Sequence, residues 1–379
     1  MHERIRTPVS VEDVLRRLEE HADSLGKGAR QVALFVRERP EEVAALNAGE
    51  VANICNVHAS SVVRLAQVIG FSGYREMQIL FKQRVIGATP SVRDPAAVRL
   101  RPPLSLRLIA ESGPSFNKAL GAAADAFCAA EPNIDIRATF HLPHEIDADS
   151  YAAEIASAGD CDGLILVARD ERPISRAVRE LVESGIPVVS LTSDLPSSGR
   201  TAYVGSDQYA AGTMAAWLSG RMARLAGNRV LLVYSVPFRC QLDRESGFRQ
   251  CLRSQFPHLS IDERVSSNEN VEVSYEAVRR YIRTNGPPVA IYNVSGGNLG
   301  VGRALEEEGL AGQTVFIGHE LNDNSRKLLE NGSMDFAIGH PFPREISLAI
   351  DCIRAARAGE QPAGHLTDIQ LYMRFNCLA

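Results

Sequence analysis

The first 86 residues carry hydrophobic positions at helical spacing. Ala29, Val32, Ala33 and Val36 stand at i, i+3, i+4 and i+7, which places them on one face of a helix. Pro40 ends this helix and begins a short helical turn. The pattern predicts helices over residues 11–22, 29–37, 48–55, 60–69 and 74–85, with the helical turn over 40–46.

From residue 106 onward, short apolar runs alternate with amphipathic stretches. The predicted strands cover 106–111, 134–140, 163–168, 187–192, 201–204, 229–235, 259–265, 288–294, 314–318, 334–338 and 366–373. Helices are predicted between them, for example over 117–130, 173–184, 208–226, 244–255, 270–283, 299–309 and 342–358. This alternation predicts parallel sheets covered on both faces. Eleven strands are too many for one open sheet, so we expect two α/β lobes. A (β/α)8 barrel is the main rival, but the strand count and the final strand, which no helix follows, disagree with it.

Residues 87–104 differ from both neighbouring regions. The stretch has little periodicity, contains four prolines and is basic through Arg93, Arg99 and Arg101. We therefore expect a linker at 87–104, between a helical domain over 1–86 and a two-lobed domain over 105–379.

Composition narrows the class of protein. The chain has 379 residues, of which 45% are hydrophobic and 23% are charged, values that exclude a disordered or fibrous protein. No apolar run approaches the roughly 18–20 residues of a membrane span, so we expect no membrane partner. The first six residues have no apolar signal core, and the seven scattered cysteines contain no Cys-x-x-Cys pair. A cytoplasmic location is therefore expected.

The net charge of −5 is unevenly distributed. Residues 1–107 hold 16 Lys and Arg against 12 Asp and Glu, a net charge of +4, and the remaining 272 residues have a net charge of −9. A basic stretch joined to an acidic body is typical of a nucleic-acid reader on a different kind of domain. Chance clustering on a solvated face is the alternative.

The stretch 48–69 has the layout of a helix-turn-helix. Val51 and Ala52 point inward from a short helix, a tight turn pivots on Val57, and Val62 and Ala66 are buried by the second helix. The second helix then presents polar residues that can pair with base edges and phosphates, namely His58, Ser60, Ser61, Arg64 and Gln67. An ordinary helical bundle shows the same pattern, and Arg64 in it would form a surface ion pair.

Further residues make the chain similar to a known family here. The segments Pro40-Glu41-Glu42-Val43 and Ile69-Gly70-Phe71-Ser72-Gly73-Tyr74-Arg75-Glu76 resemble the RpiR-type helix-turn-helix head over about residues 25–86. The resemblance implies binding to operator DNA, with Arg75 as a further phosphate contact. The chain departs from the family at His58, where a Ser cap is usual, so the bases read here are expected to differ.

The rest of the chain resembles a second family. Asp162 to Val167, Gly185 to Val189, Tyr203 to Asp207, Arg244 to Arg249 and Phe316 to Glu320 stand in the order found in LacI/GalR-type effector domains, the periplasmic-binding-protein class I fold. The resemblance implies a chain that crosses between lobes near 205, 339 and 360. It also implies a sugar or polyol held between the lobes.

Ligands of open α/β sheets bind beyond the carboxyl ends of the strands. Polar residues at these ends supply donors and acceptors for a neutral polyol, and an aromatic ring stacks on its apolar face. Together with the family motifs, this rule makes the expected ligand contacts Phe116, Asn117, Arg169, Asp170, Asp207, Arg244, Asn298, Glu320 and His340. Two alternatives stay open: Asp207 as a helix cap, and Arg244 as a surface helix residue.

No set of nucleophile, base and orienting group is recognisable, no His, Cys, Asp or Glu group has metal-ligand spacing, and no phosphate-binding glycine motif is complete. We therefore expect no enzyme activity, no metal and no cofactor. The expected protein is a homodimeric transcriptional regulator that represses genes of carbohydrate or polyol catabolism and responds to a small sugar or cyclitol. A solute-binding receptor and an enzyme acting on sugar phosphates are the alternatives.

Overall fold

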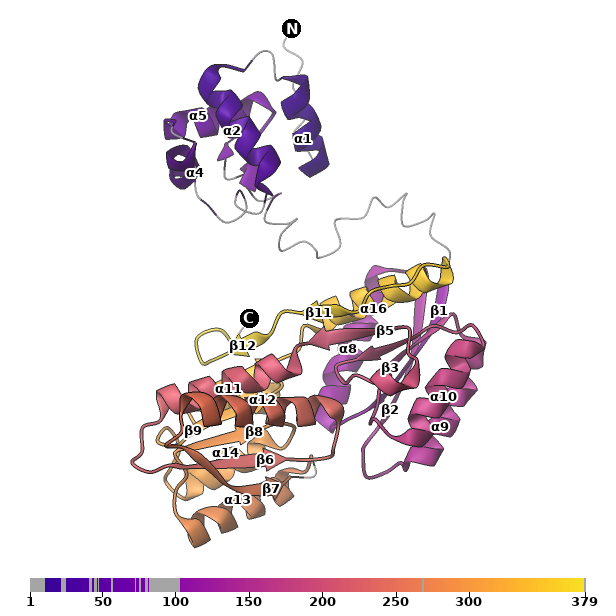
Figure 1. The fold of residues 1–379 in the computed structure, drawn as a ribbon, viewed down its shortest axis with the longest axis vertical. Coiled ribbons are helices and arrows are strands. Elements are labelled where there is room, and N and C mark those ends of the chain that lie inside the picture. The colour runs from indigo at the N-terminus through magenta and orange to yellow at the C-terminus, as the bar shows by residue number, and fades with distance from the viewer. Residues whose placement is uncertain are drawn as a thin grey trace. The chain divides into compact units, whose positions relative to one another are not determined.

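The computed structural model describes residues 11–21, 25–40, 43, 46, 48–55, 57–71, 73–74, 76–78, 81, 103–267 and 269–377. The chain divides into two compact units, Met1–Leu100 and Arg101–Ala379. Among the described residues, no helix is long and apolar enough to cross a membrane. Figure 1 shows the helices and strands of both units.

The first unit is helical. Its helices are α1 (Val11–Glu20), α2 (Lys27–Glu38), α4 (Ala48–Ile54) and α5 (Ala59–Val68). Apolar residues from all four form one core, which includes Val14, Val36, Val51, Leu65 and the later Phe81. The predicted helices at 11–22, 29–37, 48–55 and 60–69 therefore lie close to observed ones. The predicted turn at 40–46 and the predicted helix at 74–85 fall partly outside the described residues.

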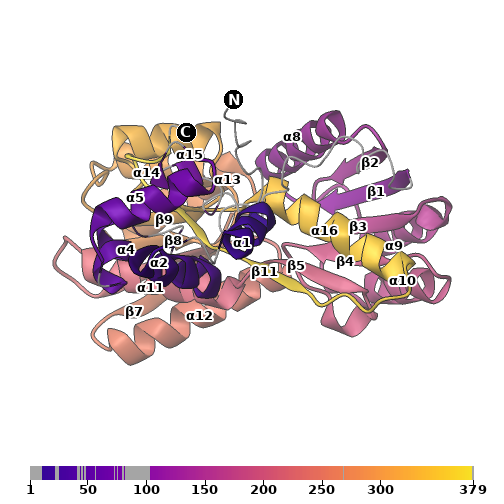
Figure 2. The ribbon, with the colours of Figure 1, turned by 90° about the horizontal axis from the view of Figure 1, so that it is seen from above.

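The first lobe of the second unit is built on a parallel sheet with strand order β11-β5-β4-β3-β1-β2. Helices α8 and α16 contact each other on one face, and α9 and α10 cover the other (Figure 2). The strands are β1 (Leu104–Glu111), β2 (Ile134–His141), β3 (Gly163–Val167), β4 (Val188–Leu191), β5 (Ala202–Ser206) and β11 (His365–Thr367). The helices are α8 (Pro114–Ala130), α9 (Ala148–Ala156), α10 (Arg172–Glu183) and α16 (Phe342–Arg357), with short 3-10 turns at Ser157–Asp160 and Pro196–Ser198.

The second lobe repeats this plan with strand order β12-β10-β9-β8-β6-β7, in which only β12 runs antiparallel to its neighbour. Helices α11 and α12 cover one face, and α13, α14 and α15 cover the other (Figure 1). The strands are β6 (Arg229–Tyr234), β7 (Ser260–Ser266), β8 (Ala290–Asn293), β9 (Val315–His319), β10 (Phe336–Gly339) and β12 (Gln370–Tyr372). The helices are α11 (Gln208–Met222), α12 (Arg239–Gln255), α13 (Val271–Asn285), α14 (Asn298–Glu307) and α15 (Asp323–Asn331).

The chain passes between the lobes three times. It crosses after β5, returns after β10 to form α16 and β11, and crosses again between β11 and β12. The prediction of one final strand over 366–373 is wrong, because this segment forms two short strands, one in each sheet. The third crossing consequently lies between Thr367 and Gln370 rather than near residue 360.

The order of the first five strands is the same in both lobes, and it fixes where a ligand can bind. In each sheet the direction of winding reverses at the second strand from one edge, β1 or β6: the next strand of the chain lies on one side of it and the later ones on the other. The carboxyl ends of the strands beside this reversal form the crevice that open α/β sheets use for ligands.

Candidate functional site

Helices α4 and α5 form the predicted helix-turn-helix. They contact each other, and the turn between them is held where the backbone N–H of Val57 donates to the carbonyl of Ala52 at 2.9 Å. Val62, Leu65 and Ala66 of α5 are buried in the core of the helical unit. The opposite face of α5 is consequently exposed.

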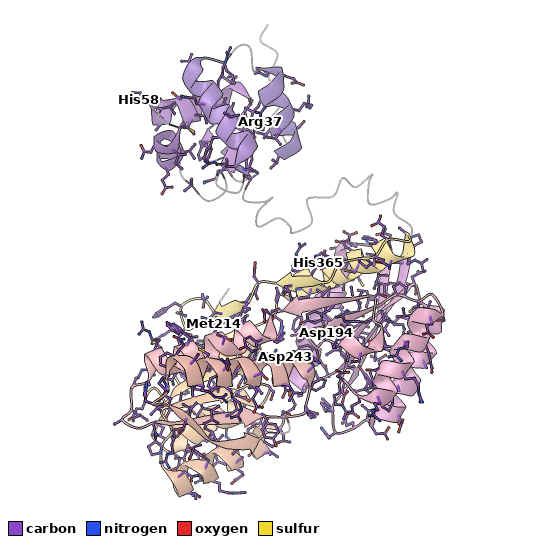
Figure 3. The ribbon with its side chains drawn as sticks, viewed as in Figure 1. Arg37, His58, Asp194, Met214, Asp243 and His365 are labelled. Atoms are coloured by element: carbon purple, nitrogen blue, oxygen red, sulfur yellow. The ribbon has the colours of Figure 1, made fainter. Side chains whose placement is uncertain are left out.

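The predicted DNA-contacting residues lie mainly on this exposed face. His58, Ser60, Arg64 and Gln67 are exposed, and Figure 3 shows His58 at the surface of the helical unit. Ser61 is half-buried and faces α2 beside Gly28. Arg75 lies outside the described residues.

Two details of this face bear on its chemistry. His58 stands at the N-cap of α5 but makes no side-chain cap hydrogen bond, and in the first turn the Ser61 N–H donates to the His58 carbonyl at 2.8 Å. Arg64 forms no ion pair with any described residue, so the surface ion pair considered from the sequence is absent from the described part of the chain. A guanidinium and a helix N-terminus on one exposed face can both meet phosphate or base edges.

In the second unit, a cavity of about 20 Å³ lies between the two lobes. Most of its wall follows the carboxyl ends of strands, at Ser112, Thr192, Ser295, Glu320 and His340. A second cavity of about 50 Å³ shares Glu269 and Glu320 with the first. Both are small beside the roughly 300–1,000 Å³ of typical ligand pockets, so a sugar-sized molecule requires the lobes to separate or side chains to move. The complete lining of the smaller cavity is Glu111, Ser112, Phe116, Val167, Thr192, Ser193, Phe238, Cys240, Gln241, Arg244, Glu269, Ser295, Glu320 and His340.

Arg244 lies at the centre of this wall and is only 4% exposed. Its Nε donates to Gln208 Oε1 and its Nη1 to the Val294 carbonyl, both at 2.7 Å, and Nη2 lies 3.4 Å from His340 Nε2. Close packing of α11 on α12 fixes its position, because a Cβ at Gly212 would stand 1.9 Å from the Arg244 carbonyl oxygen. Arg244 is therefore a buried cleft residue and not a surface one.

Two carboxylates face the cleft near Arg244. Burial, and after it the charge of Glu269, raise the pKa of Glu320 to about 8, while Arg244 opposes the rise. Burial also raises the pKa of Glu269, against hydrogen bonding from the Gly296 backbone and the charge of Arg244. Both residues have a left-handed backbone, with φ of 56° at Glu269 and 72° at Glu320. Such strain is typical of functional sites.

Aromatic groups close one side of the cavity. Phe116 meets the His340 ring edge-on with centroids 5.8 Å apart, and His340 stacks on Phe342 at 5.4 Å. The two ring nitrogens of His340 face opposite charges: Nε2 lies 3.4 Å from Arg244 Nη2, and Nδ1 lies 3.7 Å from Glu345 Oε1.

Of the predicted ligand residues, the structure brings Phe116, Arg244, Glu320 and His340 together in the wall of the smaller cavity. Asn298 lines the neighbouring cavity, but its amide already accepts from Asn293 Nδ2 at 2.7 Å and donates to the His319 carbonyl at 2.6 Å. It therefore positions the β8 and β9 ends.

The remaining predicted residues lie outside the cavity walls. Asn117 donates to the carbonyls of Ser112 and His141, and Asp207 is exposed and caps α11 through the Ala210 N–H. Arg169 pairs with Glu111 at 2.7 Å, and Asp170 lies 3.8 Å from Arg239 of the other lobe. Asp207 thus takes the cap role that was its alternative.

Sequence reasoning missed several lining residues. Thr192 directly follows β4, so the rule of strand carboxyl ends finds it, whereas Glu269 lies three residues after β7 and the rule does not single it out. The Arg169 partner Glu111 is the last residue of β1 and could be found in the same way. No group of three or more His, Cys, Asp or Glu in the described ranges could hold a metal ion.

Comparison with known proteins agrees with this geometry. A family model described as a periplasmic binding protein domain matches residues 109–361, and one described as a helix-turn-helix domain of the rpiR family matches residues 12–86. Both describe binding domains rather than enzymes.

Two curated relatives match separate parts of the chain. An uncharacterised HTH-type transcriptional regulator of Caldanaerobacter subterraneus subsp. tengcongensis is 31% identical over 67 residues, which are 18% of this chain and 24% of that protein. The ABC transporter periplasmic-binding protein YphF of Escherichia coli is 24% identical over 210 residues, which are 50% of this chain and 60% of that protein. The chain thus spans less than two thirds of the length of either relative.

Solved structures show the same fold. An ABC transporter solute-binding protein from Burkholderia graminis, in complex with D-arabinose, superposes with a TM-score of 0.67 at 19% identity, over 73% of this chain and 98% of that one. A protein from Bacteroides fragilis described as a LacI transcriptional regulator gives a TM-score of 0.64 at 16% identity, over 72% and 97% of the two chains. The chain therefore belongs to the periplasmic binding protein domain family, and it carries an rpiR-family helix-turn-helix domain at its N-terminal side.

Proposed function

We propose that the chain is a cytoplasmic transcriptional regulator that binds operator DNA through the helical domain of residues 1–86 and a small sugar or polyol through the two-lobed domain of residues 105–379. The observation that carries the proposal is the presence in one chain of an rpiR-family helix-turn-helix domain and a cleft of the periplasmic-binding-protein type. One relative of the first part is a transcriptional regulator, and structures similar to the second hold sugars.

The DNA-reading residues in this proposal are those on the exposed face of α5. Arg64 supplies the guanidinium, with His58, Ser60 and Gln67 beside it. One chain offers one recognition helix, so two half-sites and useful affinity call for a homodimer. Regulation then follows from closure of the lobes on the ligand, which changes how residues 87–104 present the two helical domains to DNA.

The effector in this proposal contacts Phe116, Arg244, Glu320 and His340. Repression of carbohydrate or polyol catabolism genes is the regulatory role that fits a sugar-responsive cleft. The linker 87–104 connects the domains.

The test is a mobility-shift assay with the promoter DNA that neighbours the gene. The full chain should shift this DNA specifically, and Arg64→Ala should weaken the shift by about tenfold or more, as expected for the loss of one base contact worth about 1–3 kcal/mol. Arg16→Ala is the matched control, because Arg16 is an exposed arginine of α1 that is paired with Asp13 and Glu20. No specific shift, or an equal effect of both substitutions, would contradict the DNA-binding assignment.

A further inference from the structure

Three carboxylates around the interlobe cleft lie beside arginines. Glu111 pairs with Arg169 at 2.7 Å, Asp170 lies 3.8 Å from Arg239, and Asp194 accepts from Arg200 Nη2 at 2.7 Å. Each of these carboxylates has an arginine beside it, although Arg169 also pairs with Glu171 and Arg239 also lies 3.7 Å from Asp243. Figure 3 shows Asp194 where the two lobes meet, near Asp243, with which it interacts electrostatically.

Neither Glu269 nor Glu320 forms an ion pair of its own within the described residues, and the charge of Arg244 acts on both. Both carboxylates line the same two cavities, and Arg244 is the one guanidinium in the described walls of these cavities. His340 does not enter this balance, because its Nδ1 faces the buried Glu345 carboxylate at 3.7 Å, which would offset a charge on the ring. The remaining titratable wall group near Arg244 is the Cys240 thiol, whose pKa burial raises, so it stays neutral. The pair of carboxylates is left with one excess negative charge, or with one proton in its place.

The cleft also contains polar groups without partners. Thr192 Oγ1 of the first lobe and Ser295 Oγ of the second are each in residues only 3% exposed, line the cavity and have no hydrogen-bond partner among the described residues. Unpartnered buried polar atoms are rare, so the two hydroxyl groups call for an explanation. The carboxylate of the half-buried Glu320 makes no hydrogen bond within the described part of the chain, although its backbone N–H and carbonyl are both bonded.

Strained backbone conformations occur at residues of the same cleft. Within the described residues, the non-glycine residues with positive φ are Thr192, Glu269 and Glu320, and all three line the smaller cavity. Each such conformation costs about 1–3 kcal/mol and persists where it serves a site. The three strained residues therefore bring two carboxylates and one hydroxyl group into the cleft.

We propose that the effector is a polyhydroxylated amine, such as an amino sugar or an aminocyclitol, whose ammonium group lies between Glu269 and Glu320 and whose hydroxyls bond to Thr192 and Ser295. The ammonium supplies the positive charge that the two carboxylates lack. The rings of Phe116 and Phe238, both in the cavity wall, add apolar and cation–π contact. This inference rests on the proposed function, since it names the ligand class of the same cleft.

Binding of the amine then replaces a proton in the cleft with the ammonium group of the ligand. The proton held by the carboxyl pair leaves to the buffer when the ammonium enters, so the charge of the cleft stays balanced. A neutral sugar has no such exchange, because its hydroxyls accept hydrogen bonds from a protonated carboxyl group without displacing the proton. Proton release thus separates the two ligand classes.

The experiment uses the full chain and three matched pairs of probes: D-glucosamine with D-glucose, D-galactosamine with D-galactose, and 2-deoxystreptamine with myo-inositol. Isothermal titration at pH 7 in two buffers of different ionisation enthalpy gives both the affinity and the number of protons released. We expect at least one amine to bind tenfold or more tightly than its neutral counterpart, with release of close to one proton.

Glu320→Gln should remove this preference, with a tenfold or greater loss of amine affinity, whereas Glu183→Gln, at an exposed carboxylate of α10, should leave it unchanged. Tighter binding of a neutral probe, or amine binding that Glu320→Gln does not weaken, overturns the inference and leaves the proposed function standing. If none of the six probes binds, the inference also falls. The mobility-shift assay on the same preparation then decides the DNA-binding part of the proposed function by itself.

Discussion

Replacing Glu320 by Gln should change how the stability of the two-lobed unit depends on pH. The substitution keeps the size of the side chain and its hydrogen-bonding capacity but removes the ionisable group. The pKa of Glu320 is about 8 in the folded chain, against an ordinary value of 4.5, because burial and Glu269 disfavour its charged form.

The sign follows from proton binding. Between pH 4.5 and about 8 the folded chain holds a proton on Glu320 that the unfolded chain has already lost. The free energy of unfolding therefore falls as pH rises through this window and levels off above about pH 8. Below pH 4.5 both states are protonated, and the stability contributed by this linkage is fully present.

The magnitude follows from the same gap. At about 1.36 kcal/mol per pH unit, the full difference corresponds to about 5 kcal/mol. Part of this change falls below pH 5, and Glu320 is half-buried, so solvent screening reduces the figure further; we expect about 2–4 kcal/mol between pH 5 and pH 9. Wild type should thus lose about that much more stability than Glu320→Gln between pH 5 and pH 9.

Urea unfolding at each pH, followed by circular dichroism, measures the difference between the two proteins. The slope of free energy against urea should stay the same, so that the midpoints report stability. Glu183→Gln, at an exposed position, serves as the control and should track wild type. Parallel curves for wild type and Glu320→Gln over pH 5–9 would refute the raised pKa and the buried carboxyl pair on which it depends.

Two further substitutions test other parts of the structure. Gly247→Ala should destabilise the second lobe by about 1–3 kcal/mol, because the added Cβ would lie 2.0 Å from the Tyr209 carbonyl oxygen and force α11 and α12 apart. Urea unfolding measures this loss. The control Gly159→Ala should be nearly neutral, because a Cβ at Gly159 meets nothing within 4 Å. His58→Ser should stabilise the helical unit by about 0.5–2 kcal/mol, since a Ser side chain can cap α5 where His58 does not. Thermal unfolding measures this gain, and an unchanged midpoint of the helical unit would contradict the N-cap assignment.

Much of the fold could be predicted from the sequence because strands and helices alternate with distinct hydrophobic periods. The buried strand Gly163–Val167 and its neighbours lie within one or two residues of their predicted positions. The C-terminal segment was predicted as one strand, because a single alternation of polar and apolar residues runs through both β11 and β12. Only the pairing of His365 with Val204 and of Leu371 with Ile338 shows that the two halves join different sheets.

The cleft was predictable where a residue directly follows a strand. Glu320 and His340 stand one residue after β9 and β10, and both reach the cavity. Glu269 lies three residues after β7, and its side chain enters the cleft through a left-handed backbone conformation that the sequence does not announce. Asp207 also follows a strand, but the free N–H groups of α11 bind its carboxylate.

The central claim is that a ligand in the cleft controls DNA binding by the helical domain. Fluorescence anisotropy of the labelled promoter DNA with the full chain tests it, in the presence and absence of the most tightly bound of the six probes. We predict specific DNA binding whose affinity changes at least tenfold when the probe is added, and a change that Glu320→Gln abolishes. Specific DNA binding with the same affinity at every probe concentration, or no specific binding at all, would contradict the account.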